Sequence, residues 1–400
     1  MRLLDFNNSY SPTGGGIRVY HHRKLEYYAS RGHEVALAVP GASPGVERLG
    51  RTVIYRLPSV PLLRSGYRLT LQSGPLLDVV NDFRPDLVEI GSPYIAPRLA
   101  RSVLGTEGTP VVGFFHTNYP ESYVKPATRR LLGEDAASRL TELAWRHVAR
   151  TYSRMTAVFA ASRSVLSALH RIGLRRLFLT PLGVDTDLFR PQRRSEEFRR
   201  GLGVTGRRKL VLYLARLHWE KGLDLLLDAY PGFRDPSRVV LAIGGLGPLE
   251  SRLGEFLHRY PEVRRLPYIP HGPEVAEAMA SADVFLSLGG TETFGLAGLE
   301  AMASGTVTVF PDSFSGGEMA KDSGVVPPFT TGSPDSLCQA VGQALDASAK
   351  AASSLREFAV NLGNWQNSFT WMEECCHRVI AASRTGSLDS LQPPGEWWEP

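Results

Sequence analysis

Short apolar segments alternate with amphipathic stretches along most of the chain. In the first half we predict β-strands over residues 3–6, 34–39, 87–90, 111–116 and 157–160. In the second half we predict strands over 209–214, 238–243, 284–288 and 307–310. Helices are predicted between the strands, such as 18–31 in the first half and 249–259 and 299–303 in the second half. Alternation of strands and helices is typical of a doubly wound parallel sheet. Because the pattern repeats in the second half, the sequence predicts two similar α/β domains in tandem.

A polar, arginine-rich stretch over residues 187–206 interrupts this alternation. Stretches that lack periodic apolar positions are typical of linkers. We therefore predict an N-terminal domain over residues 1–186 and a C-terminal domain over residues 187–372. Residues 373–400 are expected to form a final helix and a loose tail, because proline and glycine are frequent near the end.

Composition narrows the class of protein. The 400 residues are 43% apolar and 21% charged, as in ordinary globular domains. The three cysteines, two of them adjacent, suit neither a disulfide framework nor a C-x-x-C metal site, so we expect a reducing, cytoplasmic compartment. We expect no secretory leader, because the chain opens on a predicted strand, and no apolar run reaches the roughly 18 residues of a membrane span.

Charge is unevenly distributed along the chain. Residues 1–200 hold 29 Lys and Arg against 17 Asp and Glu, residues 201–400 hold 16 against 23, and the net charge is +5. A basic half suits anionic lipid, nucleic acid or phosphorylated substrates, and it is equally consistent with a solvated arginine-rich surface.

Three loops join a predicted strand to a predicted helix, which is where phosphate groups bind in α/β sheets. The first contains Gly15 and Gly16, but it lacks the G-x-G-x-x-G spacing of dinucleotide-binding folds, which disfavours a dehydrogenase. The second contains Arg216 and Lys221, whose side chains we expect to converge on one diphosphate. The third contains Gly245, which suits a nucleotide loop or merely a tight turn.

The strongest signal lies between positions 290 and 305. Glu292 follows a predicted strand, and Glu300 lies in the next helix. The turn between them consists of Thr293, Phe294, Gly295 and Leu296. The N–H groups of a helix start attract phosphate, and carboxylates accept hydrogen bonds from hydroxyl groups. We therefore predict that Glu300 binds the ribose of a nucleotide and that Glu292 binds a sugar.

These motifs resemble those of the family-4 retaining glycosyltransferases. Glu292 and Glu300 match that family's paired glutamates in an E-x-F-G-L…L-E-A-M-A-S-G context. Arg216 and Lys221 are similar to its R-x-x-x-x-K-G diphosphate clamp. The inter-domain G-V-D pattern is present at 183–185, and the matches extend from about residue 5 to about residue 380.

The resemblance implies a GT-B fold, in which two facing Rossmann-like domains have parallel sheets. The N-terminal domain would bind the acceptor, the C-terminal domain would bind a nucleotide-diphosphate hexose, and the final helix would return to the N-terminal domain. The resemblance also implies transfer with retention by front-face substitution, without a metal ion or other cofactor. Arg216, Lys221 and Glu292 would be catalytic, together with His116, which would lie beside the transferred sugar. The predicted donor-binding residues are Gly15, Gly16, Gly245, Thr293, Phe294, Gly295, Leu296 and Glu300.

Several substrates and two other functions stay open. The sequence His116-Thr117-Asn118 is similar to that of α-mannosyltransferases and sulfoquinovosyl transferases of the family, which favours GDP-mannose over a UDP-sugar. The acceptor is a glycolipid, a glycan or a small molecule. The alternatives are a nucleotide-sugar epimerase on the same fold and a non-catalytic nucleotide-sugar-binding scaffold. We expect no nucleic-acid partner, because no binding motif supports one.

Residues 123–154 carry arginines among leucines at helical spacing. Such a stretch suits an anionic membrane surface, which would make the protein peripheral at the inner face of the cell membrane. The pattern also suits an amphipathic helix that packs on its own domain, which is the preferred interpretation.

Overall fold

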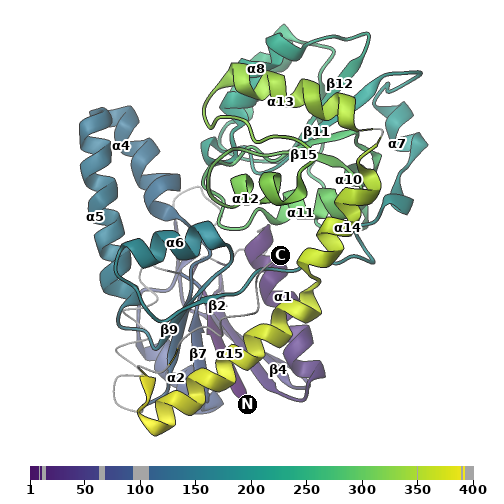
Figure 1. The fold of residues 1–400 in the computed structure, drawn as a ribbon. Helices are drawn as coiled ribbons and strands as arrows, with labels where there is room; N and C mark the ends of the chain where they lie inside the picture. Colours follow the sequence, from purple (N-terminus) through teal and green to yellow (C-terminus); the bar gives the residue numbers. More distant parts are fainter. Residues whose placement is uncertain are drawn as a thin grey trace. The chain divides into compact units, whose positions relative to one another are not determined.

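The computed structural model describes residues 1–8, 10, 15–62, 68–92, 108–348, 350–388 and 391. The chain divides into two compact units (Figure 1). The N-terminal unit combines Met1–Pro181 with Gln366–Pro400, and the C-terminal unit is Leu182–Trp365. The chain thus changes unit at 181/182 and 365/366, whereas the sequence pattern predicts 186/187 and 372/373. The predicted loose tail lies almost wholly outside the described residues.

The N-terminal unit is built on an eight-stranded sheet in the described residues, with the order β10-β9-β8-β7-β1-β2-β4-β3. The strands are β1 (Arg2–Phe6), β2 (Glu34–Pro40), β3 (Gly45–Leu49), β4 (Thr52–Leu57), β7 (Leu87–Ile90), β8 (Val111–Phe114), β9 (Ala157–Ala160) and β10 (Leu177–Leu179). A separate short ribbon pairs β5 (Val60–Pro61) with β6 (Arg68–Leu69). The prediction of a purely parallel sheet is wrong at one edge, because β3 runs antiparallel to β4. An edge strand exposed to solvent, as β3 is, leaves little apolar pattern in the sequence.

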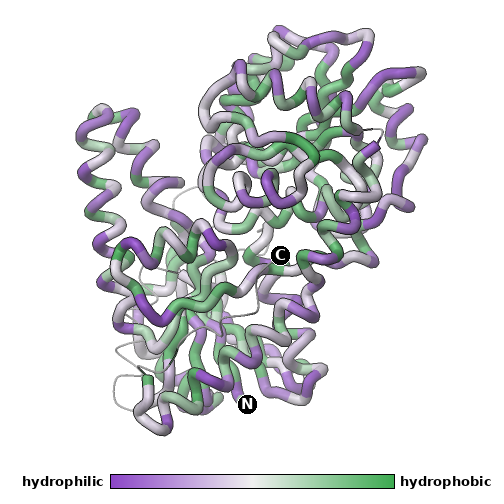
Figure 2. Tube along the Cα trace, viewed as in Figure 1, coloured by the Kyte–Doolittle hydropathy of each residue, from purple (hydrophilic) through white to green (hydrophobic). Residues whose placement is uncertain are grey.

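Helices cover both faces of this sheet, so its central strands are buried on both sides and are mainly apolar (Figure 2), with Asp5 in β1 and Glu89 in β7 as charged exceptions. The helical segments are α1 (Gly16–Ser30), α2 (Gly74–Phe83), the π-helical turn η1 (Pro120–Val124), α4 (Lys125–Leu132), α5 (Glu134–Tyr152), α6 (Arg163–Arg171) and α15 (Trp365–Thr385). The last helix, α15, packs on the N-terminal unit. The Trp371 indole donates a hydrogen bond to Leu179 O at 2.8 Å, and the Tyr27 hydroxyl of α1 donates one to Glu373 Oε2 at 3.0 Å.

The C-terminal unit has a five-stranded, wholly parallel sheet in the order β13-β12-β11-β14-β15. The strands are β11 (Lys209–Leu214), β12 (Val239–Gly244), β13 (Arg264–Leu266), β14 (Val284–Leu286) and β15 (Val307–Val309). The pattern missed β13, which is short and begins with two arginines. Because the chain order reverses between β11 and β14, a topological switch point lies between these strands, and ligands of α/β sheets bind at such points.

The helical segments of this unit are η2 (Pro191–Arg193), α7 (Glu196–Gly201), η3 (Trp219–Lys221), α8 (Leu223–Phe233), α9 (Glu250–Arg259), α10 (Pro273–Ser281), α11 (Leu296–Ala303), α12 (Phe314–Ser323), α13 (Pro334–Ala347) and α14 (Ala352–Leu362). The polar stretch that resembles a linker contributes η2 and α7. It is fixed by the buried Arg199, which donates hydrogen bonds to Ser281 O and Asp283 Oδ2, both at 2.8 Å. Across the described part of the chain, we find no helix long and apolar enough to cross a bilayer.

Candidate active site

The loops that follow β11 and β14 meet at the switch point of the C-terminal sheet. The two strands pair in parallel, with Val211 opposite Val284, so their carboxyl ends share one edge. Lys221, at the end of η3, forms an ion pair with Glu292 in the loop after β14. The structure therefore brings together two of the residues predicted to be catalytic.

Both predicted cations of this site face carboxylates. Arg216 forms an ion pair with Glu220, a largely buried residue that the sequence pattern did not single out. Burial opposes the charge of Lys221, but the carboxylates of Glu292 and Glu220 outweigh it and raise the pKa of the ammonium. Lys221 is therefore a fixed cation at neutral pH, as binding of a diphosphate requires.

Two glycines allow the neighbouring loops to approach closely. A Cβ on Gly245, which has φ 133°, would lie 1.8 Å from Ala215 O. The loop after β12 is then tied to the loop after β11, because Leu217 N donates to Leu246 O at 2.9 Å. Gly222, with φ 75°, has the same role beside Leu288. Close packing of the loops thus explains Gly245 by itself, and its contact with a donor stays a prediction.

Glu300 lies on α11, whose N-cap is Gly295 with φ 83°. Its side chain is buried, and Oε1 lies 2.8 Å from Nε2 of His271. His271 was missed because a single histidine before a helix has no motif. The turn from Thr293 to Leu296 leads from Glu292 into this helix, and the Ser315 hydroxyl donates to Glu292 O at 2.9 Å. The carboxylate predicted to bind ribose is therefore held in place by a neighbouring imidazole.

His116 follows β8 in the N-terminal unit and is half-buried in an aromatic cluster. Its ring stacks on Phe114 with a centroid distance of 4.0 Å and meets Tyr20 edge-on at 4.7 Å. Burial, and then the nearby His21, lower the pKa of His116 well below its ordinary value. The ring is therefore neutral at physiological pH, so it can exchange hydrogen bonds with a sugar without carrying a charge.

A buried network of charges, which the sequence pattern missed, lies beside this cluster. Lys24 Nζ contacts Glu89 Oε2 at 2.7 Å and Asp5 Oδ2 at 3.1 Å, and the Tyr20 hydroxyl donates to Glu89 Oε1 at 2.7 Å. His21 Nδ1 lies 2.8 Å from Asp5 Oδ2. Burial opposes ionisation throughout. Even so, the partners raise the pKa of Lys24 and lower that of Asp5, whereas burial raises that of Glu89.

The first glycine loop is only partly described. Gly15 is the N-cap of α1, Gly16 is its first residue, and the space around a Cβ on Gly15 is open. Gly14 lies outside the described residues. The helix start is therefore placed, and its contact with a donor stays a prediction.

Comparison with known proteins identifies the class of this chain. Residues 14–188 match Glycosyltransferase Family 4, and residues 194–360 match Glycosyl transferases group 1. The chain belongs to the family-4, group 1 glycosyltransferases.

Two bacterial relatives and one solved structure illustrate the likeness. The chain is 33% identical over 314 residues to the GDP-mannose-dependent alpha-(1-6)-phosphatidylinositol dimannoside mannosyltransferase of Mycobacterium tuberculosis, covering 77% of this chain and 79% of that protein. It is 27% identical over 318 residues to the GDP-mannose-dependent alpha-mannosyltransferase of Corynebacterium glutamicum, covering 78% and 72%. Sucrose-phosphate synthase from Thermosynechococcus elongatus superimposes with a TM-score of 0.78 at 17% identity, covering 96% of this chain and 100% of that one.

These findings establish the α/β GT-B fold and the class of enzyme. The protein is a glycosyltransferase that uses a nucleotide-sugar donor. The epimerase and the non-catalytic scaffold, which the sequence left open, thereby lose their support.

Proposed function

We propose that this enzyme transfers mannose from GDP-mannose to a lipid-linked acceptor at a membrane surface, with retention of configuration and without a metal ion. The observation that carries the donor site is the contact between Lys221 and Glu292 at the switch point, next to the start of α11. Fixed positive charge, a helix N-terminus and buried Glu300 are the groups that a nucleoside diphosphate requires.

Each group has a separate task in this proposal. Lys221, Arg216 and the N–H groups at the start of α11 bind the diphosphate. Glu300 accepts hydrogen bonds from the ribose hydroxyls, and Glu292 accepts one from the sugar. Because Lys221 already pairs with Glu292, an arriving diphosphate shares the ammonium with this carboxylate, which then turns to the sugar.

The reaction is a front-face substitution. The acceptor oxygen forms a bond to the anomeric carbon on the face from which the diphosphate leaves, while the bond between that carbon and the phosphate oxygen breaks. The departing phosphate oxygen takes the proton of the acceptor hydroxyl. Lys221 and Arg216 stabilise the negative charge that develops on the diphosphate, which is the role that a metal ion has in other transferases. His116 exchanges a hydrogen bond with the sugar through its neutral ring.

GDP-mannose is the favoured donor for two reasons. The two bacterial relatives are named as GDP-mannose-dependent enzymes, and the sequence His116-Thr117-Asn118 is similar to that of α-mannosyltransferases. A UDP-sugar is the second candidate.

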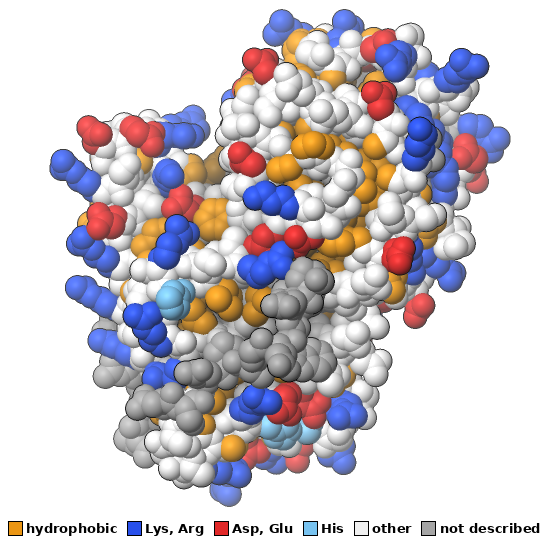
Figure 3. Space-filling model, viewed as in Figure 1, with side chains coloured by type: hydrophobic (Ala, Val, Ile, Leu, Met, Phe, Trp, Pro, Cys, Tyr) orange, Lys and Arg blue, Asp and Glu red, His pale blue; other side chains and the backbone are white. Residues whose placement is uncertain are grey.

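A basic, partly apolar helix pair supports the membrane acceptor. Helices α4 and α5 lie side by side (Figure 1), and basic side chains gather along the pair, at the left of Figure 3. At the end of α4, Leu131 is 78% exposed and Leu132 is 67% exposed, directly after Arg129 and Arg130. Two adjacent exposed leucines beside arginines suit insertion into an anionic lipid interface. Packing on the N-terminal unit does not account for them.

A transfer assay tests the proposal. The enzyme is incubated with anionic membrane lipids and radiolabelled GDP-mannose, UDP-glucose or ADP-glucose in the presence of EDTA, and the organic phase is counted. We expect label from GDP-mannose alone, and NMR of the product should show an α-linkage. Transfer from a UDP-sugar only, a β-linked product, or activity that EDTA abolishes and Mg²⁺ restores would each contradict the corresponding part of the proposal.

A further inference from the structure

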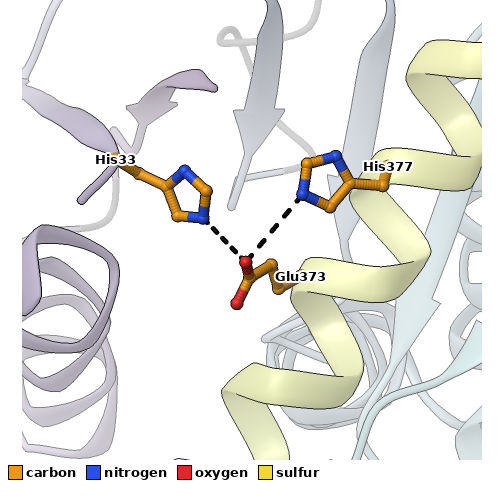
Figure 4. Close-up of side chains that lie close together, drawn as sticks. All are labelled: His33, Glu373 and His377. Atoms are coloured by element: carbon orange, nitrogen blue, oxygen red, sulfur yellow. Dashed lines mark hydrogen bonds and ion pairs between the residues drawn. The ribbon is translucent and has the colours of Figure 1, made fainter. Parts of the chain in front are cut away.

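Three side chains of the N-terminal unit converge between the last helix, α15, and the turn before β2. His33, Glu373 and His377 point toward one another (Figure 4). Glu373 Oε1 lies 2.7 Å from Nε2 of His33 and 3.9 Å from Nε2 of His377. One nitrogen or oxygen atom of each residue lies within 4.8 Å of the other two. No other cluster of this kind is found among the described residues.

The local structure fixes the orientation of these three side chains. Glu373 and His377 are four residues apart on α15, so they share one face of the helix. His33 comes from the turn between α1 and β2, and its Nδ1 lies 3.0 Å from the Met1 amine, which turns Nε2 toward Glu373. On the other side of the carboxylate, Oε2 accepts a hydrogen bond from Tyr27 at 3.0 Å and lies 3.5 Å from Nε of Arg31. Oε1 is thus the oxygen that faces both imidazoles.

We propose that His33, Glu373 and His377 bind a transition-metal dication, with Zn²⁺ as the ion that best suits the set. Two imidazoles and one carboxylate are a recognised zinc ligand set, with Zn–N and Zn–O distances of about 2.0–2.2 Å. Around such an ion, neighbouring ligand atoms lie about 3.3 Å apart in a tetrahedron. The observed 2.7 and 3.9 Å bracket this value. His377, whose side chain is 50% exposed, has room for the small rotation that closes the site.

The position of the cluster assigns it a structural role. His33 precedes β2, so the cluster lies at the amino edge of the parallel sheet, whereas His116 follows the carboxyl end of β8. The seven residues of β2 span roughly 20 Å at about 3.3 Å each. A metal ion at this site takes no part in sugar transfer. It links α15 to the turn before β2. The proposal is therefore independent of the metal-free transfer mechanism.

The experiment measures zinc binding to the full-length protein after removal of metals with a chelator and desalting. Isothermal titration with ZnCl₂ should show one saturable site per chain, and thermal unfolding should shift upward with ZnCl₂ but not with MgCl₂, which prefers oxygen ligands. His377→Ala should weaken Zn²⁺ binding at least tenfold and abolish the thermal shift. Even the loss of a residue that only contacts a metal ligand lowers metal affinity by about 10–100-fold. The matched control is His258→Ala, an exposed histidine near the end of α9, which should bind Zn²⁺ like the wild type.

The outcomes separate a metal site from a simple ion pair. Because His377 is half-exposed, the His377→Ala protein should fold, and without metal it should unfold at the wild-type temperature. Wild-type protein that shows no saturable heat with ZnCl₂ would overturn the proposal. Equal Zn²⁺ affinity in wild type and His377→Ala would also overturn it, since the ion would then bind elsewhere. A loss of stability in His377→Ala without metal, with no further effect of ZnCl₂ on either protein, would assign the cluster to a salt bridge alone.

Discussion

Lys221 and Glu292 form an ion pair across the switch point of the C-terminal sheet, although 71 positions separate them in the sequence. Both side chains are partly exposed, at 29% and 28%. The carboxylate therefore neutralises the cation that is expected to bind the diphosphate. Changes at the two residues should have different consequences for nucleotide binding and for catalysis.

Lys221→Ala and Glu292→Gln should separate these two steps. Lys221→Ala removes a transition-state contact of about 3 kcal/mol, so turnover should fall roughly a hundredfold and GDP should bind more weakly. Glu292→Gln should also reduce turnover, but GDP should bind as in wild type or up to about fivefold more tightly, because a partly exposed ion pair contributes at most about 1 kcal/mol. Calorimetry with GDP and steady-state rates measure both effects. Weaker GDP binding in Glu292→Gln, or a comparable loss of turnover in the exposed control Lys350→Ala, would contradict the assignment.

Glu300→Ala should remove the stabilisation that the nucleotide provides. At about a hundred times its dissociation constant, a ligand stabilises the native state by roughly 2.7 kcal/mol, which a thermal-shift assay detects. With GDP, UDP and ADP we expect GDP to raise the unfolding temperature of the wild type most, and we expect this shift to be lost in Glu300→Ala. Glu255→Ala, at an exposed position of α9, should keep the full shift. A GDP shift that survives in Glu300→Ala would rule out the ribose role.

Lys24→Met should destabilise the N-terminal unit. The change leaves the buried carboxylates of Asp5 and Glu89 without the cation they share, and breaking a buried pair typically costs about 3–5 kcal/mol. Lys125→Met is the matched control, because Lys125 pairs with Glu121 at a side-chain exposure of 41% and should contribute less than about 1 kcal/mol. Urea unfolding of both variants measures the difference. Equal free energies of unfolding in the two variants would show that the buried network does not stabilise the N-terminal unit.

His116 should contribute to the acid sensitivity of the protein. Burial lowers its folded-state pKa below the unfolded value of about 6.5. As the pH falls through 6.5, the unfolded chain takes up a proton that the folded chain does not, so stability is lost on acidification. Between pH 7.5 and 5.5, His116→Gln should therefore lose about 1 kcal/mol less unfolding free energy than the wild type. His258→Gln, at an exposed site, should follow the wild type, and an identical pH dependence in all three proteins would refute the prediction.

Leu131→Ser combined with Leu132→Ser should reduce binding to membranes. Insertion of a leucine side chain into an apolar environment contributes roughly 1.5–3 kcal/mol, so affinity for anionic phospholipid vesicles should fall at least tenfold (about 1.4 kcal/mol). Vesicle co-sedimentation at low and high salt measures this, and binding should also weaken with salt because of the neighbouring arginines. Val360→Ser, at an exposed position of α14, should leave binding unchanged. Wild-type protein that fails to bind anionic vesicles at low salt would exclude this membrane surface.

Sequence patterns predicted most of the buried strands, although they missed β4 and β10, and they predicted the exposed or polar strands poorly. The predicted bounds of β7, β9 and β11 agree with the structure, because strands covered on both faces consist mainly of apolar residues. The edge strand β3 and the arginine-rich β13 have no such run. Neither was predicted.

The buried charges of the N-terminal unit also could be predicted only in part from the sequence. Asp5 and Glu89 each interrupt an apolar strand, and a charge at a position that should be buried is a signal of a partner. The sequence does not say which partner, and Lys24 lies on a helix between them. A charge inside a predicted buried strand therefore indicates such a network.

By itself, the sequence determined the alternation of strands and helices, the two-unit α/β organisation and the segment from Glu292 to Glu300, because each depends on residues close together in the chain. The tertiary structure alone decided that Glu292 meets Lys221, that His271 holds Glu300, and that His33 reaches Glu373. These contacts depend on the order of the strands in a sheet and on where a returning helix packs. Burial of apolar surface over a whole unit fixes both, and no local pattern encodes them.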